Sequence, residues 1–330
     1  MMFSSDPDSV DITQLSQEEQ DNLIQALLTR FRLYTSFGIA ALVLNAIIVV
    51  VHLSNREMFK RYILFTMLSL ADLINGASFV AAGVGREMLI HERTYFTRIT
   101  TSQCLTTLPW PILLVFAGQL PAAMNLMLAI ERVIAVECSM WYRRVWTWKY
   151  KAMLGTFGYA VCAIGFGIGV YASHLGEQVY QARMCSVMES TGVIYGSVHY
   201  SLISLAYLAS FIVILVIFMI TRANKKLTDA EFLRQKILFA VIGVSVVFVS
   251  FPNAILVLNE WHVIDSGPLF VGVAYCLYAI SSTFNLFIYI AFRHDFRQQL
   301  LILVCLGKKN STKFFMKTTT VIVTKASSGA

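Results

Sequence analysis

Charged side chains are scarce in this sequence. Asp, Glu, Lys and Arg make up 14% of its 330 residues, whereas hydrophobic residues make up 57%. Soluble domains contain roughly a quarter of charged residues, so the composition excludes an ordinary soluble enzyme or binding domain. The few charges are also unevenly spaced, because uncharged residues gather in long runs.

Several functional signatures are missing as well. The sequence has no His-Glu-x-x-His or Gly-x-Ser-x-Gly pattern, and its six histidines are scattered. It shows no internal repeat of the kind found in many transporters. It also lacks the Lys/Arg-rich stripe with interleaved aromatics that is typical of nucleic-acid binding. These absences argue against an enzyme, a transporter and a nucleic-acid-binding protein, and we expect no cofactor and no metal site.

What the chain has in abundance is apolar runs long enough to cross a bilayer. A helix of about 20 apolar residues spans the hydrocarbon core, and a backbone in lipid must form helices or a closed barrel. The runs do not alternate in polarity as barrel strands do. We therefore predict an all-α membrane protein, a bundle of seven transmembrane helices. The runs are Leu33–Leu53, Tyr62–Gly83, Leu105–Ile130, Met153–Ser173, Ile194–Ile220, Ile237–Leu258 and Leu269–Ala291.

The positive charges predict the orientation of these spans. Twenty of the 26 Lys and Arg residues flank the runs on one side and six flank them on the other. Cytoplasmic flanks are enriched in Lys and Arg, so we expect an extracellular N-terminus and a location in the plasma membrane. We divide the chain into an extracellular tail (1–32), the seven-helix bundle (33–291), and a C-terminal segment that contains an amphipathic stretch and a cytoplasmic tail (292–330).

The N-terminal segment shows no basic-then-apolar signal peptide, so we expect the first span to act as its own targeting signal. Ser16 and Glu19 have the spacing of a capping box. This pattern predicts a short amphipathic helix that leads into the first span. A mobile tail is the alternative.

Only two of the six cysteines, Cys104 and Cys185, fall on the predicted outer side. Because the outside is oxidising, we expect them to form a disulfide; two free thiols are the alternative. The disulfide would pin the loop after the fourth span to the top of the third. Cys305 follows an amphipathic stretch near the inner membrane surface and is a candidate for reversible palmitoylation.

Three strongly polar side chains lie inside the predicted spans, where each is costly and requires a reason. They are Asn45 in the first span, Asp72 in the second and Asn285 in the seventh. We predict one buried polar cluster, with Asp72 as the acceptor and the two asparagines as donors. Such a cluster can simply hold helices together. Its carboxylate can also change protonation during a conformational switch.

Several motifs together resemble the rhodopsin-like (class A) G-protein-coupled receptors. Glu131–Val136, followed by Met140–Arg144, is similar to the end of their third helix and their second inner loop, although a snorkelling interfacial arginine would also explain Arg132. Leu70–Leu73 resembles their second helix, and Asn45 the asparagine of their first. The resemblance covers about 260 residues.

The C-terminal part of the resemblance lies in the last two spans. Asn285–Tyr289 resembles the seventh-helix Asn-Pro-x-x-Tyr motif, and Ala291–Arg297 resembles the eighth helix. Pro252 stands where the sixth helix of the family is kinked. Among the departures, Leu286 replaces the seventh-helix proline and Ser250 replaces the sixth-helix tryptophan.

Two further departures concern the third helix. Val133 replaces an aromatic residue, and Pro121 replaces a serine that helps to bind sodium, which argues against a sodium site at Asp72. Pro109, Pro111 and Pro121 each remove a backbone donor, so we expect the outer third helix to bend or partly unwind. Such a pattern resembles divergent chemosensory receptors, including the large nematode serpentine families.

The resemblance implies a receptor that binds an extracellular small molecule or peptide and activates a heterotrimeric G protein. Switch residues would be Glu131, Arg132, Pro252, Asn285 and Tyr289. The family often locks the arginine to an acid at the base of the sixth helix, where this chain has Phe232 with Glu231 beside it. Anionic membrane lipids are expected partners of the basic inner loops.

The resemblance also places a ligand pocket in the outer third of the bundle. Its candidate lining residues are Leu114, Gly118, Gln119, Asn253, Tyr275 and Tyr278, for each of which plain helix packing is the alternative. Leu114 takes the place of the aspartate of aminergic receptors, which disfavours an amine ligand. No lysine lies between Lys236 and Lys308, so a retinal Schiff base is excluded. A seven-helix ligand-gated channel of the insect odorant type is the alternative function, and it would need an N-terminus inside the cell.

Overall fold

The computed structural model describes residues 16–223, 229–261, 263–264 and 268–305, and most of these are helical. The helices are α1 (Gln17–Leu53), α2 (Arg56–Arg61), α3 (Ile63–His91), α4 (Thr101–Thr107), α5 (Pro109–Glu137), α6 (Ser139–Val145), α7 (Trp148–Leu175), α8 (Val187–Thr191), α9 (Val193–Ala223), α10 (Asp229–Ser245), the π-helical turn η3 (Val246–Ser250), α11 (Phe251–Glu260), α12 (Pro268–Phe292) and α13 (His294–Val304), and the strands are β1 (Ile99–Thr100) and β2 (Val179–Tyr180).

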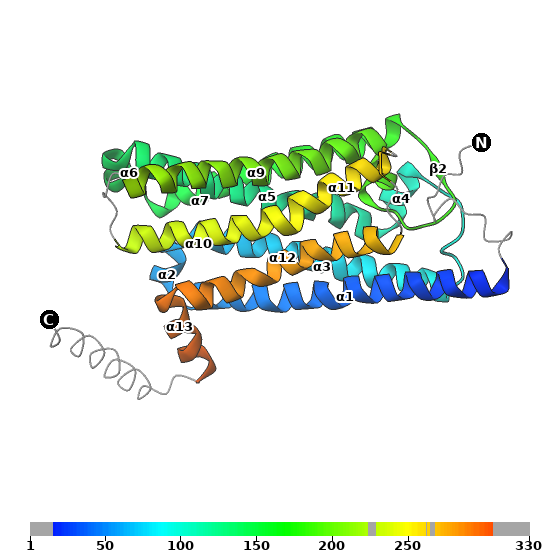
Figure 1. Cartoon of the computed structure of the whole chain (residues 1–330), viewed down its shortest axis with the longest axis horizontal. Coiled ribbons are helices and arrows are strands. Elements are labelled where there is room, and N and C mark those ends of the chain that lie inside the picture. The colour runs from blue at the N-terminus through cyan, green and yellow to red at the C-terminus, as the bar shows by residue number, and fades with distance from the viewer. Residues whose placement is uncertain (1–15, 224–228, 262, 265–267, 306–330) are drawn as a thin grey trace.

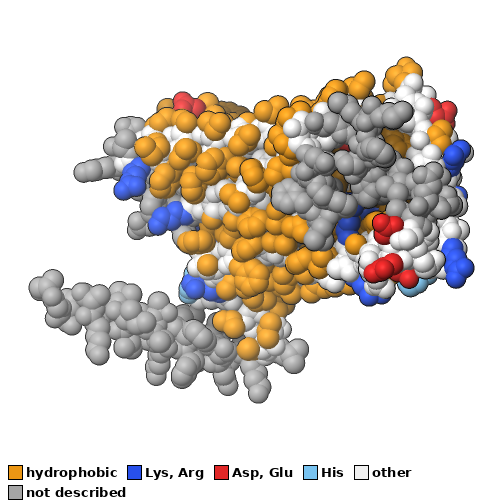
Figure 2. Space-filling model, turned by 45° about the vertical axis from the view of Figure 1, so that its right-hand side comes forward, with side chains coloured by type: hydrophobic (Ala, Val, Ile, Leu, Met, Phe, Trp, Pro, Cys, Tyr) orange, Lys and Arg blue, Asp and Glu red, His pale blue; other side chains and the backbone are white. Residues whose placement is uncertain are grey.

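The predicted all-α, seven-helix architecture is confirmed. Among the described residues, seven helices are long and apolar enough to cross a membrane, the sixth being α10, η3 and α11 together. Large apolar side chains such as Ile39, Met153 and Ile164 are exposed on the sides of the bundle. Figure 2 shows this apolar surface between two ends that carry the charged side chains. Soluble proteins rarely expose so large an apolar surface to water. The chain is therefore a multi-pass membrane protein.

The spans pack side by side along one axis (Figure 1). Helix α1 packs against α3 and α12, and α5 packs against α3, α7 and α9; α9 in turn contacts α10 and α11, and α10 contacts α12. The bundle therefore has two ends. We call the end with α4, β1, β2 and the disulfide the disulfide end, and the opposite end, with α2, α6 and α13, the α13 end.

The first helix begins well before Leu33. Ser16 forms the predicted capping box: its hydroxyl accepts from the Glu19 amide at 3.4 Å and its own amide donates to the Glu19 carboxylate at 2.9 Å. From Gln17 the helix then runs without a break to Leu53. The predicted helix that leads into the first span is therefore present, in place of the alternative of a mobile tail, and residues 1–15 lie outside the described part of the chain.

The third span begins at Pro109 rather than at Leu105. Leu108 is extended (φ −112°, ψ 137°), because a residue before proline is pushed out of the helical region. It separates α4 from α5. Pro109 then starts α5, where its missing N–H is not needed, and α5 continues through Pro121. The helical conformation is interrupted at Leu108, directly before Pro109, and not within the third helix.

The predicted disulfide between Cys104 and Cys185 is confirmed, with a Cα–Cα distance of 5.5 Å and both residues fully buried. It ties the segment after α7 to α4 rather than to α5 itself. Beside it, β1 pairs antiparallel with β2, placing Ile99 opposite Tyr180. The disulfide end is thus closed by a small cross-linked cap.

The sixth span contains a π-helical turn, η3, directly before Pro252. Proline cannot donate to the carbonyl one turn earlier, and its ring would clash with that carbonyl in a regular helix. The wider turn relieves this conflict. The expected irregularity at Pro252 is present, but it takes the form of an inserted wide turn that the sequence did not indicate.

The eighth helix is present as α13, which leaves the axis of α12 at a steep angle (Figure 1). Arg293 is in an extended conformation (φ −116°, ψ 101°) and separates the two helices. Phe296 is fully buried against the bundle, whereas Leu301 and Val304 are exposed. These exposed apolar residues suit a helix that lies on a membrane surface. Cys305 follows its last turn and is exposed.

Helices α1 and α3 approach each other closely at a pair of glycines, Gly38 and Gly76. A Cβ atom on Gly76 would lie 2.9 Å from the Leu42 amide nitrogen and 3.1 Å from the Gly38 carbonyl oxygen. Both of these neighbours are backbone atoms that cannot move aside. In contrast, a Cβ on Gly167 in α7 meets nothing within 4 Å.

We predict that Gly76→Ala lowers the thermal stability of the purified protein. Overpacking of this kind costs about 1–3 kcal/mol. Gly167→Ala is the matched control and should stabilise by about 0.5–1 kcal/mol, because alanine favours a helix over glycine. Thermal unfolding in detergent micelles measures both. Equal midpoints for the two variants would contradict the close backbone contact.

Candidate functional site

A buried carboxylate in the middle of the bundle joins α3 to α12. The side chain of Asp72 accepts a hydrogen bond from the Ser282 hydroxyl at 2.8 Å and another from the Asn285 amide at 2.7 Å. All three residues are at most 5% exposed. The two donors are three residues apart and so lie on one face of α12. Each carboxylate oxygen therefore has a donor from the same helix.

Asn45 lies near this cluster but does not donate to Asp72, so that part of the sequence prediction is wrong. Its amide donates to the carbonyl of Ala41 at 2.9 Å and to the carbonyl of Ser282 at 3.2 Å. Ser282 takes the donor position beside the carboxylate, and its own carbonyl faces Asn45. The sequence analysis missed Ser282, although a run of three hydroxyl residues, 281–283, inside an apolar span was a signal.

At the α13 end, the carboxylate of Glu131 has three donors beside it. Glu131 accepts hydrogen bonds from Arg132 and from the Tyr142 hydroxyl, and Lys151 Nζ lies 3.2 Å from its Oε1. The Glu131 side chain is 2% exposed and that of Arg132 is 8% exposed. The pairing joins α5, α6 and α7. We call these four residues the Glu131 site.

Two of the four residues escaped the sequence analysis. Tyr142 was quoted only as part of a motif, and Lys151 was counted only among the basic flanks. Neither sequence spacing nor hydropathy places them beside Glu131, because α6 and α7 reach it through the tertiary fold. The other expected partners of Arg132, Glu231 and Phe232, have side chains outside the described part of the structure.

A buried cation lies nearby at the junction of α12 and α13. The Arg293 side chain is 3% exposed. Its guanidinium carbon lies 3.5 Å from the ring centre of Tyr62 and 5.3 Å from that of Tyr289, with Phe65 and Phe296 each at 5.8 Å. Aromatic faces attract a cation through their quadrupoles. Tyr289, a predicted switch residue, therefore packs against Arg293.

The polar neighbours of Arg293 complete this junction. Its Nη1 lies 3.2 Å from Nε2 of His52. Arginine can only donate, so Nε2 accepts and a neutral His52 carries its proton on Nδ1, which lies 3.0 Å from the Thr66 hydroxyl. The sequence analysis counted Arg293 only as a basic residue.

On the exposed side of the same junction, the Tyr62 hydroxyl donates to Asp295 at 2.8 Å. Burial by itself raises the pKa of Asp295, but the Tyr62 hydrogen bond and the Arg293 charge outweigh it and hold that pKa below its ordinary value. Asp295 therefore stays ionised at neutral pH. It fixes the first turn of α13 against the segment between α2 and α3.

The disulfide end contains two small adjoining cavities with mostly apolar walls. Phe79, Leu114, Val187 and Tyr275 line both of them. The first cavity is completed by Tyr34, Ala82, Arg86, Met184 and Ser186, and the second by Asn75, Gly118, His199, Tyr200, Ile203 and Tyr278. Of the six predicted lining residues, Leu114, Gly118, Tyr275 and Tyr278 are therefore brought together.

Gln119 and Asn253 line neither of these two cavities, contrary to the prediction. Gln119 follows Gly118 by about 100° around α5, and its amide lies 3.2 Å from the Tyr195 hydroxyl and 3.0 Å from Nδ1 of His199. Asn253 is fully buried in α11. Among the described residues, neither amide atom of Asn253 has a hydrogen-bond partner. Also within that part of the chain, no group of three His, Cys, Asp or Glu residues could hold a metal ion.

We predict that Ser282→Ala destabilises the protein, because it leaves one oxygen of Asp72 without its donor in a site that is closed to water. The expected loss is about 1–2 kcal/mol. Thr283→Ala is the control, since its hydroxyl bonds only to the Ile280 carbonyl of its own helix, at 2.7 Å. Thermal unfolding in lipid nanodiscs gives the comparison. If both variants lose the same stability, the contact with Asp72 contributes nothing specific.

Comparison with known proteins identifies no family for this chain. No family model and no curated protein matches the chain. The candidate function therefore depends on the residues themselves: a buried carboxylate between α3 and α12, an arginine paired at the α13 end of α5, and cavities at the disulfide end.

Proposed function

We propose that this chain is a G-protein-coupled receptor that resembles the rhodopsin-like class, possesses no enzymatic activity, and binds an extracellular ligand at its disulfide end. The observation that carries the proposal is the buried pair of Arg132 with Glu131 at the α13 end of α5. A charge of this kind, held near the membrane surface by a neighbouring acid, is a natural element of a switch: it can be released when the helices move.

The proposed orientation puts the disulfide end outside the cell and α13 in the cytoplasm. The excess of Lys and Arg at the flanks of the α13 end supports it, and so does the disulfide, because disulfides persist in oxidising surroundings. The plasma membrane is the location that suits a receptor with this orientation. The basic α13 end would contact anionic lipids and the G protein.

The proposed mechanism is an equilibrium between two arrangements of the bundle that the ligand biases. Ligand contacts with Tyr275 and Tyr278 on α12, and with Tyr200 on α9, would favour a state in which α10 swings outward. The turn η3 and Pro252 would serve as the pivot. Two hydroxyl contacts across this region, Ser204 with the Ser250 carbonyl and Ser281 with Ser245, are each 3.3 Å long, and hydrogen bonds of this length are weak enough to exchange.

Outward movement of α10 would open a cleft at the α13 end for the C-terminal helix of a G protein. Arg132 would leave Glu131 and turn toward the cleft. The carboxylate of Glu131 would keep Tyr142 and Lys151 as partners. The loss of one partner therefore does not leave a buried charge unpaired, which keeps the barrier between the states low.

We predict that Glu131→Gln raises ligand-independent nucleotide exchange on a G protein by about fivefold or more, the range of a typical coupling free energy. The substitution weakens the hold on Arg132. The double variant E131Q/R132A should lose this activity, because Arg132 is needed in the cleft. Exchange of labelled GTP in membranes, tested with each class of Gα subunit, measures the effect.

Arg144→Ala is the control for these variants, since Arg144 is exposed on α6. It should leave exchange unchanged. Activity in E131Q/R132A equal to that in E131Q would refute the role assigned to Arg132. So would an ion conductance of the purified protein in a planar bilayer, which is the behaviour of a ligand-gated channel.

The orientation has its own prediction. An epitope tag at the N-terminus should be accessible to antibody in cells that are not permeabilised, whereas a tag at the C-terminus should require permeabilisation. The reason is the distribution of positive charge. The reverse result would support the channel alternative and contradict a receptor.

A further inference from the structure

Arg86 is a buried cation at the disulfide end. It lies near the end of α3 and is 3% exposed. Its Nε donates to the carbonyl of Met184 at 2.7 Å, and its Nη2 to the carbonyl of Cys185 at 3.3 Å. These bonds hold the guanidinium against the segment that carries the disulfide. They supply only the partial charges of two carbonyls.

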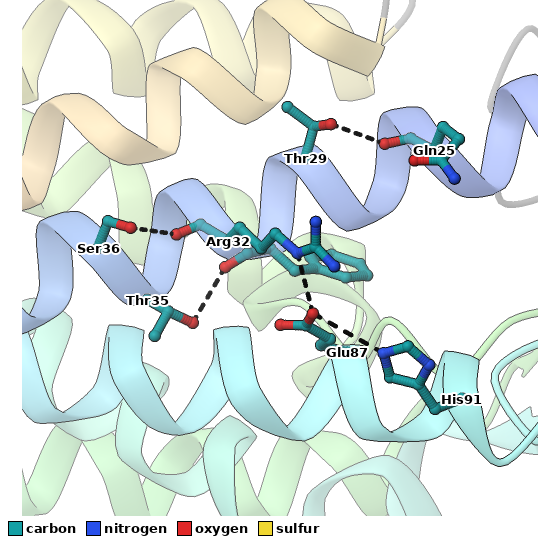
Figure 3. Close-up of polar contacts among 8 residues, drawn as sticks. Gln25, Thr29, Arg32, Thr35, Ser36, Glu87 and His91 are labelled. Atoms are coloured by element: carbon teal, nitrogen blue, oxygen red, sulfur yellow. Dashed lines mark hydrogen bonds and ion pairs between the residues drawn. The ribbon is translucent and has the colours of Figure 1, made fainter.

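No carboxylate neutralises Arg86 within the described part of the chain, where no ion pair involves this residue. The adjacent acid, Glu87, points to the outside of the bundle. There it pairs with Arg32 at 3.0 Å and lies 3.8 Å from His91, as Figure 3 shows. A buried charge without a counterion is costly. Among the described residues, Arg86 therefore has no counterion to offset the cost of its burial.

The guanidinium also lines the first cavity, which in this structure has room for about one water molecule and would have to widen to admit a larger ligand. Arg86 lines the first cavity together with Tyr34, Phe79 and Met184. The two carbonyl bonds involve Nε and Nη2, so Nη1 remains for another acceptor. The other walls of this cavity are mainly apolar and aromatic, which strengthens an ionic contact inside it.

The second cavity extends this space toward α9 and α12. At its far side the Tyr278 hydroxyl is buried and, among the described residues, has no hydrogen-bond partner. The Tyr200 and Tyr275 hydroxyls are bonded to each other at 2.8 Å. The two cavities together thus offer a cation at one end, apolar walls between, and a single unpaired hydroxyl at the other end.

We propose that this site binds a small apolar monocarboxylate. Its carboxylate would pair with Arg86, its apolar body would lie between Phe79 and Leu114, and its tail would reach Tyr278. A single guanidinium in apolar walls matches one negative charge better than a phosphate. This inference names the class of ligand for the proposed receptor. It rests on the proposed function only for the activation of a G protein that follows binding.

The first experiment uses the full-length wild-type protein in lipid nanodiscs. The probes are 3-phenylpropionate and octanoate, each compared with the alcohol and the amine of the same skeleton. Both carboxylates should raise the midpoint of thermal unfolding in a concentration-dependent way, and the alcohols and amines should not. If no carboxylate raises the midpoint, or if the alcohols raise it equally, the proposal is wrong.

The second experiment tests the residue. Arg86→Gln keeps a donor for the Met184 carbonyl but removes the charge, and it should weaken binding of 3-phenylpropionate by about 30-fold or more. Arg86→Lys should bind more tightly than Arg86→Gln, because it keeps the charge. Arg32→Gln is the matched control: it removes an outer arginine that is 62% exposed, and it should retain wild-type affinity.

Unchanged affinity in Arg86→Gln, or an equal loss in Arg32→Gln, would overturn the proposal. Should Arg86→Gln fail to fold, Leu114→Phe offers a second route, because it fills the space shared by the two cavities and should abolish binding. Unchanged binding in Leu114→Phe would equally contradict the site.

Nucleotide exchange separates this inference from the proposed function. Carboxylate binding that is lost in Arg86→Gln but never alters exchange on any G protein would leave the site standing and refute the receptor. Activation of exchange by a ligand without a carboxylate, equal in wild type and Arg86→Gln, would support the receptor and refute the carboxylate site.

Discussion

Hydrocarbon offers no hydrogen-bond partner, so each polar group inside the bundle depends on a neighbouring helix. The Asp72 carboxylate illustrates this constraint. It receives both donors from one face of α12, Ser282 and Asn285, and so fixes the rotation and depth of α12 relative to α3. Asn45 adds a bond from α1 to the Ser282 carbonyl. Three helices are thereby held in register at mid-depth, and in the proposed mechanism they would form the fixed frame against which the sixth span pivots.

Three of the four arginines that are buried in the described part of the chain meet the same constraint in different ways. Arg132 pairs with a carboxylate. Arg293 lies among aromatic rings, donates to His52, and has its Nε 3.9 Å from the Asp295 carboxylate. Arg86 donates to two backbone carbonyls and lies over the rings of Phe31 and Tyr34. The first two arrangements balance the charge within the chain. Within the part of the chain that the structure describes, the third has no carboxylate beside it, and it is also the only one of the three that lines one of the cavities at the disulfide end. This difference in charge balance is the reason why we propose Arg86, and not Arg132 or Arg293, as the residue that binds a carboxylate ligand.

The irregular sixth span links these regions. Pro252 prevents a regular helix, and η3 absorbs the mismatch directly beside the α9 contact at Ser204. Such a π-helical turn interrupts the regular i to i−4 hydrogen-bond ladder and is one of the recognised causes of a helix kink. The disulfide end, in contrast, is restrained by the Cys104–Cys185 bond. A cross-linked cap, an irregular sixth span and a paired arginine at the far end are consistent with the ligand-driven switch that we propose.

The sequence alone determined the fold class, an all-α membrane protein with seven spans, and most of the order of its elements. The number and approximate limits of the spans, the disulfide and the capping box at Ser16 all follow from run length, residue type and short spacing, which are properties of the chain in one dimension. The eighth helix was predicted from the resemblance of Ala291–Arg297 to that element of a known receptor class. Prolines marked the places where a helix starts or widens, although whether Pro109 begins α5 or bends it depended on the conformation of Leu108.

Tertiary structure decided which polar groups meet. Gly118 and Gln119 are adjacent in sequence, yet one lines a cavity and the other bonds toward Tyr195 and His199, because one step along a helix turns the side chain by about 100°. Arg86 and Glu87 are also adjacent but point in different directions. Arg86 lines a cavity, whereas Glu87 pairs with Arg32 on the outside of the bundle. Helix rotation and depth are fixed by packing between distant segments, as at Gly38 and Gly76. Sequence spacing by itself carries no information about them.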